Sequence, residues 1–381
     1  MIYLDHHATT PCDARVAAAM MSWLTDDFGN PHSDSHEAGR FAAAAVGTAI
    51  ESIARGIHAP GESVVITSGA TESNLLAIRG VVTHPRQKRR KIVTVATEHP
   101  AVLDVTEELR NDGFAVTVVG VDPHGRVDLD ALEASIDDQT AIVSVMWANN
   151  EVGTIAPMTE IARLTHDRGA LLHSDATQAV GRIPVDVRQT DVDLISGSAH
   201  KFYGPKGVGF LSVGNGNRRV RIKPIMTGGG QQRGRRGGTM NPAGIVAMAK
   251  ALELCRCEAG QSSEIARHRD LLWQRLSSAI DGMVLNGPSL DSPHRLPGNL
   301  NVSLPGVEGE AWMAATPDVA FSSGSACSSV DPTPSHVLLA MGLSESEARR
   351  SVRFGIGRTT TEDEILQAAD RLITASRRLS R

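Results

Sequence analysis

Short apolar runs rich in β-branched residues alternate with helical segments between residues 63 and 213, and this alternation constrains the fold more than any other feature. The runs occupy residues 63–67, 92–96, 115–119, 140–146, 170–174, 193–196 and 208–213. Apolar strands that are joined through helices pair in parallel and are buried on both faces. We therefore predict an α/β fold with a mostly parallel sheet of the seven-stranded type, covered by helices on both faces.

The chain has 381 residues, which is longer than one hydrophobic core usually supports. We expect a large domain over residues 13–245 and a smaller α+β domain over residues 246–381. Residues 1–12 are expected to return and pack on the smaller domain.

Charge and hydropathy exclude several classes of protein. The 43 acidic and 38 basic residues give a net charge of −5, so nothing favours direct nucleic-acid binding. The basic run at residues 86–91 lies between a predicted helix and a predicted strand, which indicates a solvated loop. No apolar stretch reaches the ~20 residues of a membrane span, and the N-terminus opens without a signal segment. We expect a soluble, cytoplasmic protein with no membrane contact.

The four cysteines are too few and too scattered for a disulfide framework or a paired zinc site, and no metal site is expected. Cys255 and Cys257 lie two apart on a predicted helix, so they should point to different sides of it. We interpret both as packing residues.

Polar residues stand where several of the apolar runs end. In parallel sheets, ligands gather at the carboxyl ends of the strands. We therefore predict one shared pocket for His99, Asn150, Asp175, Gln178, His200 and Lys201.

Two of these positions indicate cofactor chemistry. Lys201 follows a strand and a run of small residues, which is how an amine that forms a Schiff base with pyridoxal phosphate must be presented. The alternative is an ordinary surface lysine. Asp175 could hold a proton on a pyridine nitrogen, or it could simply be a helix N-cap.

The other positions leave similar alternatives. His99 could lie against the cofactor ring and exchange protons with the substrate, or it could be structural. Gln178 could donate to the ring hydroxyl or be an ordinary helix residue. Residues 68–74 open a helix after a strand, where free backbone N–H groups bind anions, although a capping turn would also explain the Ser and Thr there.

Cys327 is flanked by small polar residues in the segment 321–329, so we expect a mobile loop. A structural cysteine is expected among large apolar neighbours instead. Both a reactive thiol and a packing residue remain open on this evidence.

Motifs along nearly the whole chain resemble those of the cysteine desulfurases of the NifS and IscS type, which are pyridoxal-phosphate enzymes of the class V aminotransferase group with fold type I. The resemblance rests on residues 3–5, 28–32, 68–72, 97–100, 149–154, 175–178, 198–201, 228–232, 238–241, 322–327 and 351–354. It departs from the family at His32, where Ser is usual, and at Gly237, where Ser or a similar residue is usual. The short spacing after Cys327 is similar to the long-loop group of these enzymes.

The resemblance implies a role for each matching position. Lys201 would bind the cofactor covalently and then move the substrate's α proton, Asp175 would pair with the pyridine nitrogen, and Gln178 would bond the ring oxygen. His99 would stack on the ring. The phosphate would be surrounded by Ala70, Thr71, Ser198 and His200, with Thr239 reaching it from the other subunit of a homodimer. Asn150 and Arg353 would bind the substrate carboxylate.

The implied reaction converts L-cysteine to L-alanine and leaves a persulfide on the nucleophile Cys327. The sulfur would pass to a protein acceptor that serves iron–sulfur clusters, tRNA thiolation or DNA phosphorothioation, and no residue pattern identifies which. Two alternatives stay open. One is another enzyme of this cofactor class, such as a selenocysteine lyase or an aminotransferase, and the other is a sulfur-relay scaffold that has lost catalysis.

Overall fold

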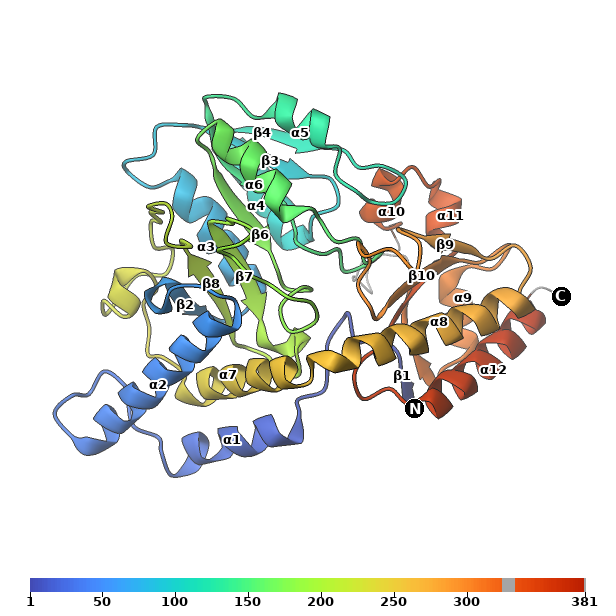
Figure 1. The fold of residues 1–381 in the computed structure, drawn as a ribbon, viewed down its shortest axis with the longest axis horizontal. Helices are drawn as coiled ribbons and strands as arrows, with labels where there is room; N and C mark the ends of the chain where they lie inside the picture. The colour runs from blue at the N-terminus through green and yellow to red at the C-terminus, as the bar shows by residue number, and fades with distance from the viewer. Residues whose placement is uncertain (324–332, 380–381) are drawn as a thin grey trace.

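The computed structural model describes residues 1–323 and 333–379. The predicted nucleophile, Cys327, lies outside the described residues. Figure 1 shows two unequal parts that are joined along one side by two helices running end to end, α7 (Pro242–Cys257) and α8 (Ser262–Ala279).

The larger part is built on a seven-stranded sheet with the order β2-β8-β7-β6-β5-β3-β4. The strands are β2 (Val64–Thr67), β3 (Lys91–Val95), β4 (Ala115–Val119), β5 (Thr140–Ser144), β6 (Leu171–Asp175), β7 (Leu194–Ser198) and β8 (Gly209–Val213). Only β8 runs antiparallel to its neighbours within this sheet. The prediction of an α/β fold with a mostly parallel sheet is confirmed.

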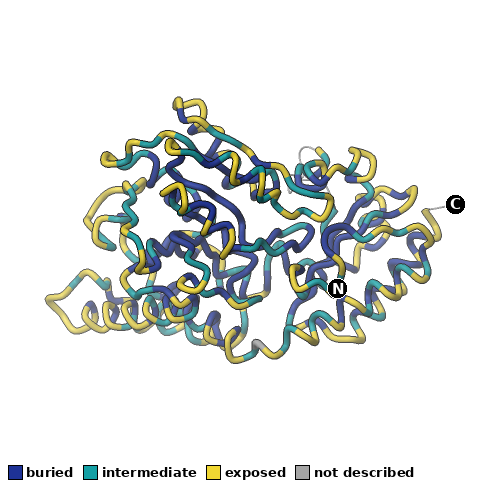
Figure 2. The backbone as a smooth tube through the Cα atoms, turned by 45° about the horizontal axis from the view of Figure 1, so that its top comes forward, coloured by how far each residue is buried: buried dark blue, intermediate teal, exposed yellow. Residues whose placement is uncertain are grey.

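Both faces of this sheet are covered because successive residues of a strand point to opposite faces. Ile92 and Ile142 pack in one core, whereas their neighbours Val93 and Val143 pack in the other. The first face carries α3 (Ala70–Val82) and α4 (Pro100–Asn111). The second carries α1 (Ala14–Thr25), α2 (Glu37–Gly56), α5 (Leu129–Ser135), α6 (Met158–Asp167) and α7. Figure 2 shows the resulting buried centre and exposed outer helices.

The smaller part holds an antiparallel sheet with the order β12-β13-β10-β9. Its aromatic core joins Trp312, Phe321 and Phe354, with ring centroids 4.9 to 5.9 Å apart. The elements are β9 (Val284–Asn286), β10 (Asn299–Ser303), α9 (Gly309–Ala315), β11 (Val319–Ala320), β12 (Ser322–Ser323), α10 (His336–Ala340), α11 (Glu345–Arg349), β13 (Ser351–Gly355) and α12 (Glu362–Leu379).

The N-terminal segment starts beside this smaller sheet. Strand β1 (Ile2–Tyr3) pairs in parallel with β11, and Leu4 is fully buried in the same core. The domain division at residue 245 stays a prediction; Ile245 lies inside α7 and packs in the core of the larger part.

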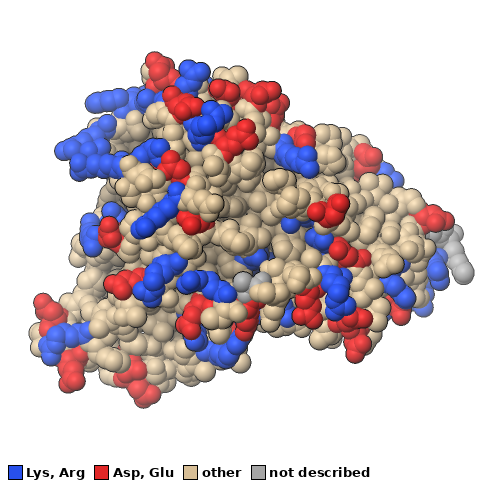
Figure 3. Space-filling model, in the orientation of Figure 1, with Lys and Arg blue, Asp and Glu red and all other residues tan. Residues whose placement is uncertain are grey.

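The surface charge agrees with the small net charge, since lysines and arginines alternate with acidic residues over the face in Figure 3. The basic run lies in the loop between α3 and β3, as predicted, except that Lys91 begins β3. Within residues 1–323 and 333–379, no helix is long and apolar enough to cross a membrane, and no group of three or more His, Cys, Asp or Glu side chains could hold a metal.

The interpretation of the paired cysteines is wrong for one of them. Cys255 is buried, and its Sγ lies 3.6 Å from the carbonyl oxygen of Phe202. Cys257 is exposed, because two residues along a helix turn the side chain by about 200° and so away from the core.

Candidate active site

A cavity of about 550 Å³ lies at the carboxyl ends of the central strands. It brings together ten of the predicted site residues: Ala70, Thr71, His99, Asn150, Asp175, Gln178, Ser198, His200, Lys201 and Arg353. Thr239 does not line it and is exposed on the segment before α7. The shared pocket inferred from the strand ends is therefore present in the fold.

Lys201 is the last residue of a 3₁₀ turn, Ala199–Lys201, that follows β7 directly. The strand continues to Ser198, two residues further than predicted, so the lysine lies on a short regular turn and not on an irregular loop. Its Nζ donates to the carbonyl oxygens of His7, at 2.8 Å, and Ala8, at 2.7 Å. The N-terminal segment thus holds the amine at the cavity.

Asp175 ends β6, and each of its carboxylate oxygens has a defined donor. Oδ1 accepts from the backbone N–H of Thr177 at 3.0 Å, and Oδ2 accepts from Nδ2 of Asn74 at 2.7 Å. The carboxylate therefore caps a turn and also lines the cavity, so the two interpretations from sequence are compatible. Asn74, a buried residue of α3, was not singled out from the sequence.

A second carboxyl group, Glu98, is fully buried and is subject to the charge of Asp175. Burial, followed by the negative charge of Asp175, raises the pKa of Glu98 well above its ordinary value. Its Oε1 accepts from the backbone N–H of Met146. Burial and the charge of Asp175 thus both favour the neutral form of Glu98.

His99 is the N-cap of α4, and its Nδ1 accepts from the backbone N–H of Ala101 at 3.1 Å. Burial is the largest cause that lowers the pKa of the ring. Since Nδ1 is an acceptor, the neutral ring carries its proton on Nε2. His99 therefore combines the structural role with a place in the cavity wall.

Gln178 is oriented by a histidine that sequence reasoning missed. Its Nε2 donates to the carbonyl oxygen of His7 at 2.9 Å, and its Oε1 lies 2.9 Å from Nδ1 of His7. An amide oxygen only accepts, so the neutral ring carries its proton on Nδ1. Burial lowers the pKa of His7 well below its ordinary value, which keeps the ring neutral.

The first turn of α3 lines one end of the cavity. No side chain caps this helix, so the capping alternative is not what the structure shows, and backbone N–H groups near Ala70 and Thr71 remain available to an anion. Ser198 and His200 line the same cavity. Burial, with the charges of Lys201 and Lys206, lowers the pKa of His200 to about 4, so its ring is a neutral donor or acceptor.

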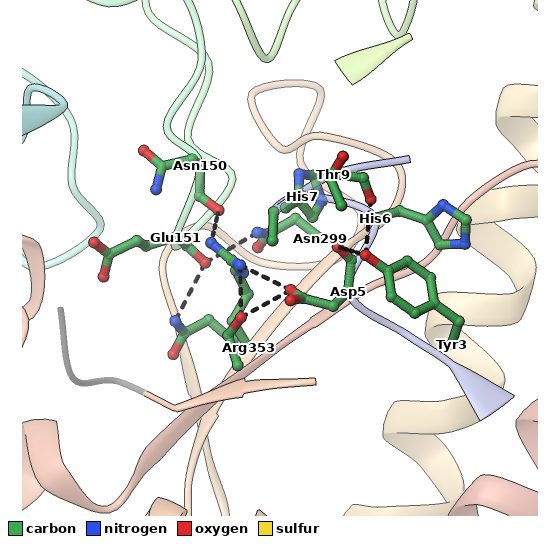
Figure 4. A network of polar contacts seen from close by, with 12 residues as sticks. Tyr3, Asp5, His6, His7, Thr9, Asn150, Glu151, Asn299 and Arg353 are labelled. Carbon is green, nitrogen blue, oxygen red and sulfur yellow. Dashed lines mark hydrogen bonds and ion pairs between the residues drawn. The ribbon is translucent and has the colours of Figure 1, made fainter. Parts of the chain in front are cut away.

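Arg353 enters the cavity from β13 of the smaller sheet (Figure 4). One terminal nitrogen donates to Oδ1 of Asp5 and to Oγ of Ser322, both at 2.8 Å, and the other donates to the carbonyl oxygen of Asn150 at 3.1 Å. Its buried Nε has no hydrogen-bond partner among the described residues. The Asn150 side chain points away from the guanidinium in Figure 4.

These residues fit pyridoxal phosphate by the chemistry of their donors and acceptors. A primary amine, a carboxylate that can face a ring nitrogen and an uncapped helix N-terminus share one cavity. Arginine adds a planar cation suited to a carboxylate.

The chain is similar to known proteins along nearly its whole length. A family model described as aminotransferase class-V matches residues 2–367. A protein named cysteine desulfurase IscS from Anaeromyxobacter sp. (strain Fw109-5) is 48% identical over 365 residues, which cover 96% of this chain and 89% of the relative.

Two solved structures are similar to this chain over most of their length. One, described as a NifS-like protein, has a TM-score of 0.90 and 34% identity, covering 100% of this chain and 99% of the other. Another, described as SspA in complex with cysteine, has a TM-score of 0.83 and 31% identity, covering 95% of this chain and 100% of the other.

Proposed function

This chain belongs to the aminotransferase class-V family, and on that premise we propose that it is a cysteine desulfurase that converts L-cysteine to L-alanine. The observation that carries the proposal is the meeting of Lys201, Asp175 and the start of α3 in one cavity, beside Arg353. The similarity to proteins named cysteine desulfurase selects this reaction among those of the family.

Pyridoxal phosphate, when bound, supplies an electron sink for the Cα–H bond of the substrate. Lys201 would hold it covalently, Asp175 would face its ring nitrogen and Gln178 its ring oxygen. His99 would stack against the ring. The phosphate would be bound by Ala70, Thr71, Ser198 and His200, together with Thr239 of the partner subunit.

The substrate carboxylate would be bound by Arg353 and the side chain of Asn150. Asp5 and the Asn150 carbonyl hold the guanidinium in place. The Nζ of Lys201 then moves the α proton. These contacts support a carboxylate-binding role for Arg353 and a proton-moving role for Lys201.

Cys327 is proposed as the nucleophile. Its thiolate attacks the Sγ of cysteine, the Cβ–Sγ bond breaks, and Cβ takes up a proton to give alanine. The new S–S bond leaves a persulfide on Cys327, which passes to a protein acceptor for iron–sulfur clusters, tRNA thiolation or DNA phosphorothioation.

A homodimer is supported by apolar side chains on the surface of the larger part. Met21, Leu24, Phe28 and Phe41 are 53% to 77% exposed, all on or between α1 and α2. Monomeric proteins rarely expose such a group together. A second copy that covers a surface of this kind would complete the site by supplying Thr239. The cytoplasmic location remains a prediction.

The test uses purified, cofactor-loaded protein with L-cysteine and a reductant, and measures sulfide and alanine. We expect the two products in equal amounts. Release from selenocysteine alone would favour a selenocysteine lyase, and amino transfer to a keto acid would favour an aminotransferase. A lack of turnover with cofactor bound would favour the scaffold alternative.

A further inference from the structure

A second cavity of about 690 Å³ lies where α7 gives way to α8, the junction visible along the lower side of Figure 1. Its wall includes Leu252 and Cys255 of α7, and Ser262 and Ile265 of α8. It shares only His7 with the lining of the candidate active site. Both cavities therefore border the N-terminal segment at His7.

Arg182 forms the wall between this cavity and the Lys201 segment. The preceding Gly181 has a φ of +77°, and a Cβ there would come within 2.5 Å of the Phe202 side chain. Glycine thus permits the turn that brings Arg182 against the backbone of Lys201. The guanidinium donates from one terminal nitrogen to the carbonyl oxygens of Lys201, at 3.1 Å, and His6, at 2.5 Å.

The charge on Arg182 is not balanced by any carboxylate of the described residues. Its neighbour in the lining, Arg358, pairs with Glu258 at 3.0 Å and with Asp13, and stacks on the Tyr203 ring. Among the described residues, Arg182 has no such partner, and its buried Nε makes no hydrogen bond. A half-buried guanidinium that has a buried nitrogen without a partner and no counter-charge favours an anion beside it.

Two further buried polar atoms in the same lining have no partner within the described parts of the chain. They are Nε2 of His7 and Oε1 of Gln261. Because Nδ1 of His7 carries the proton, both atoms are acceptors that need a donor. Most of the wall surface is apolar, with Ile183, Leu296 and Ile356 among its members, and the charged side chains of Asp186, Arg256, Glu258 and Arg358 also line it. A mainly apolar wall with convergent polar groups is typical of small-molecule sites.

We propose that this second cavity binds a small organic monoanion with an apolar body, whose acidic group pairs with Arg182 and whose hydrogen-bond donor faces Gln261. The volume suits a molecule of that kind. Arg182 would contact the occupant, and it also donates to the carbonyl oxygen of Lys201. The occupant and the backbone that positions the reactive amine would therefore contact the same side chain. The site is independent of the proposed reaction.

The test is a fluorescence titration of the cofactor-loaded protein with anilinonaphthalene sulfonate, an apolar monoanion that carries one N–H donor. Loading with cofactor keeps the probe out of the first cavity. We expect saturable binding of one probe per chain. Arg182→Met should weaken it by about tenfold or more, since a charge-assisted hydrogen bond is lost.

Ser262→Trp fills the cavity from the opposite wall, away from Lys201, and should abolish probe binding while cysteine turnover remains. Arg168→Met removes an exposed arginine outside both cavities and should bind like the wild type. Binding that is unchanged in Ser262→Trp, or no saturable binding to the wild type, would overturn the proposal. Loss of probe binding without loss of turnover separates this test from that of the proposed reaction.

Discussion

Asn74, on the first turns of α3, donates through Nδ2 to Oδ2 of Asp175 at the end of β6, and the two atoms lie 2.7 Å apart. Both side chains are buried. The bond fixes the orientation of the carboxylate, so under the proposed function Asn74 would be a positioning residue for the cofactor.

Asn74→Leu should therefore weaken cofactor binding. The substitution leaves a buried carboxylate oxygen without its donor, a loss of about 1.5 to 3 kcal/mol, or tenfold or more in affinity. Equilibrium dialysis followed by absorbance measures the dissociation constant of the cofactor. Asn111→Leu, an exposed change at the end of α4, serves as the matched control. Equal affinities in the two variants would contradict the role of Asn74.

Lys201 should be the residue that holds the cofactor covalently. Borohydride reduction of the loaded protein, followed by peptide mass spectrometry, should find the cofactor mass on the peptide of Lys201. Lys206 lines the same cavity and provides the matched control. Lys206→Ala should keep the attachment and Lys201→Ala should lose it; attachment that survives in Lys201→Ala would refute the assignment.

Arg353→Lys should raise the KM for cysteine by about tenfold, with a smaller change in kcat. Lysine keeps the charge but loses the planar fork that can hold Asp5, Ser322 and a carboxylate together. Steady-state kinetics measures both constants. Arg350→Lys, a few residues away and outside the cavity lining, should leave them unchanged. An unaltered KM in Arg353→Lys would show that the substrate carboxylate binds elsewhere.

The stability of the protein should fall between pH 7 and pH 5, partly through His173. This ring is fully buried between Ser144 and Ser196, at 2.9 and 3.0 Å, and burial lowers its pKa from 6.5 to about 4. The unfolded chain therefore takes up the proton first as the pH falls. The contribution of neutral His173 to the free energy of unfolding is therefore complete above about pH 6.5, and it is lost as the pH falls toward 4.

His173→Gln removes this titration while keeping groups that can bond both serines. Urea unfolding at the two pH values should show a loss of stability that is smaller by about 2 kcal/mol in the variant than in the wild type. His294→Gln changes an exposed histidine and should follow the wild type. The same pH dependence in His173→Gln would mean that the buried ring does not contribute.

The strands of the large sheet could be predicted because they are buried on both faces and read as continuous apolar runs. The expected run at 115–119 coincides with β4, and no end of the other expected runs differs from the observed strand by more than two residues. The antiparallel direction of β8 was not predicted. It follows from the short link after Lys201, which is too brief for the crossover that a parallel strand requires.

Residues at strand ends were found from sequence because the topology brings such ends together. Their supporting partners were not, because the contacts join distant segments. Asn74 lies 101 residues from Asp175, and His7 lies 171 residues from Gln178. Neither residue type has a local pattern that indicates such a contact. Asn74 could have been suspected from its place just inside a helix that follows a strand.

Under the proposed function, Lys201 moves the α proton of cysteine through the bound cofactor, and Cys327 takes the sulfur atom. The most direct measurement compares wild type and Cys327→Ser, both loaded with cofactor and given L-cysteine, for alanine formation and for a mass increase of one sulfur atom on the peptide of residue 327. The wild type should show both, and the variant should keep the cofactor's absorbance but form neither. Alanine production by Cys327→Ser would contradict the account.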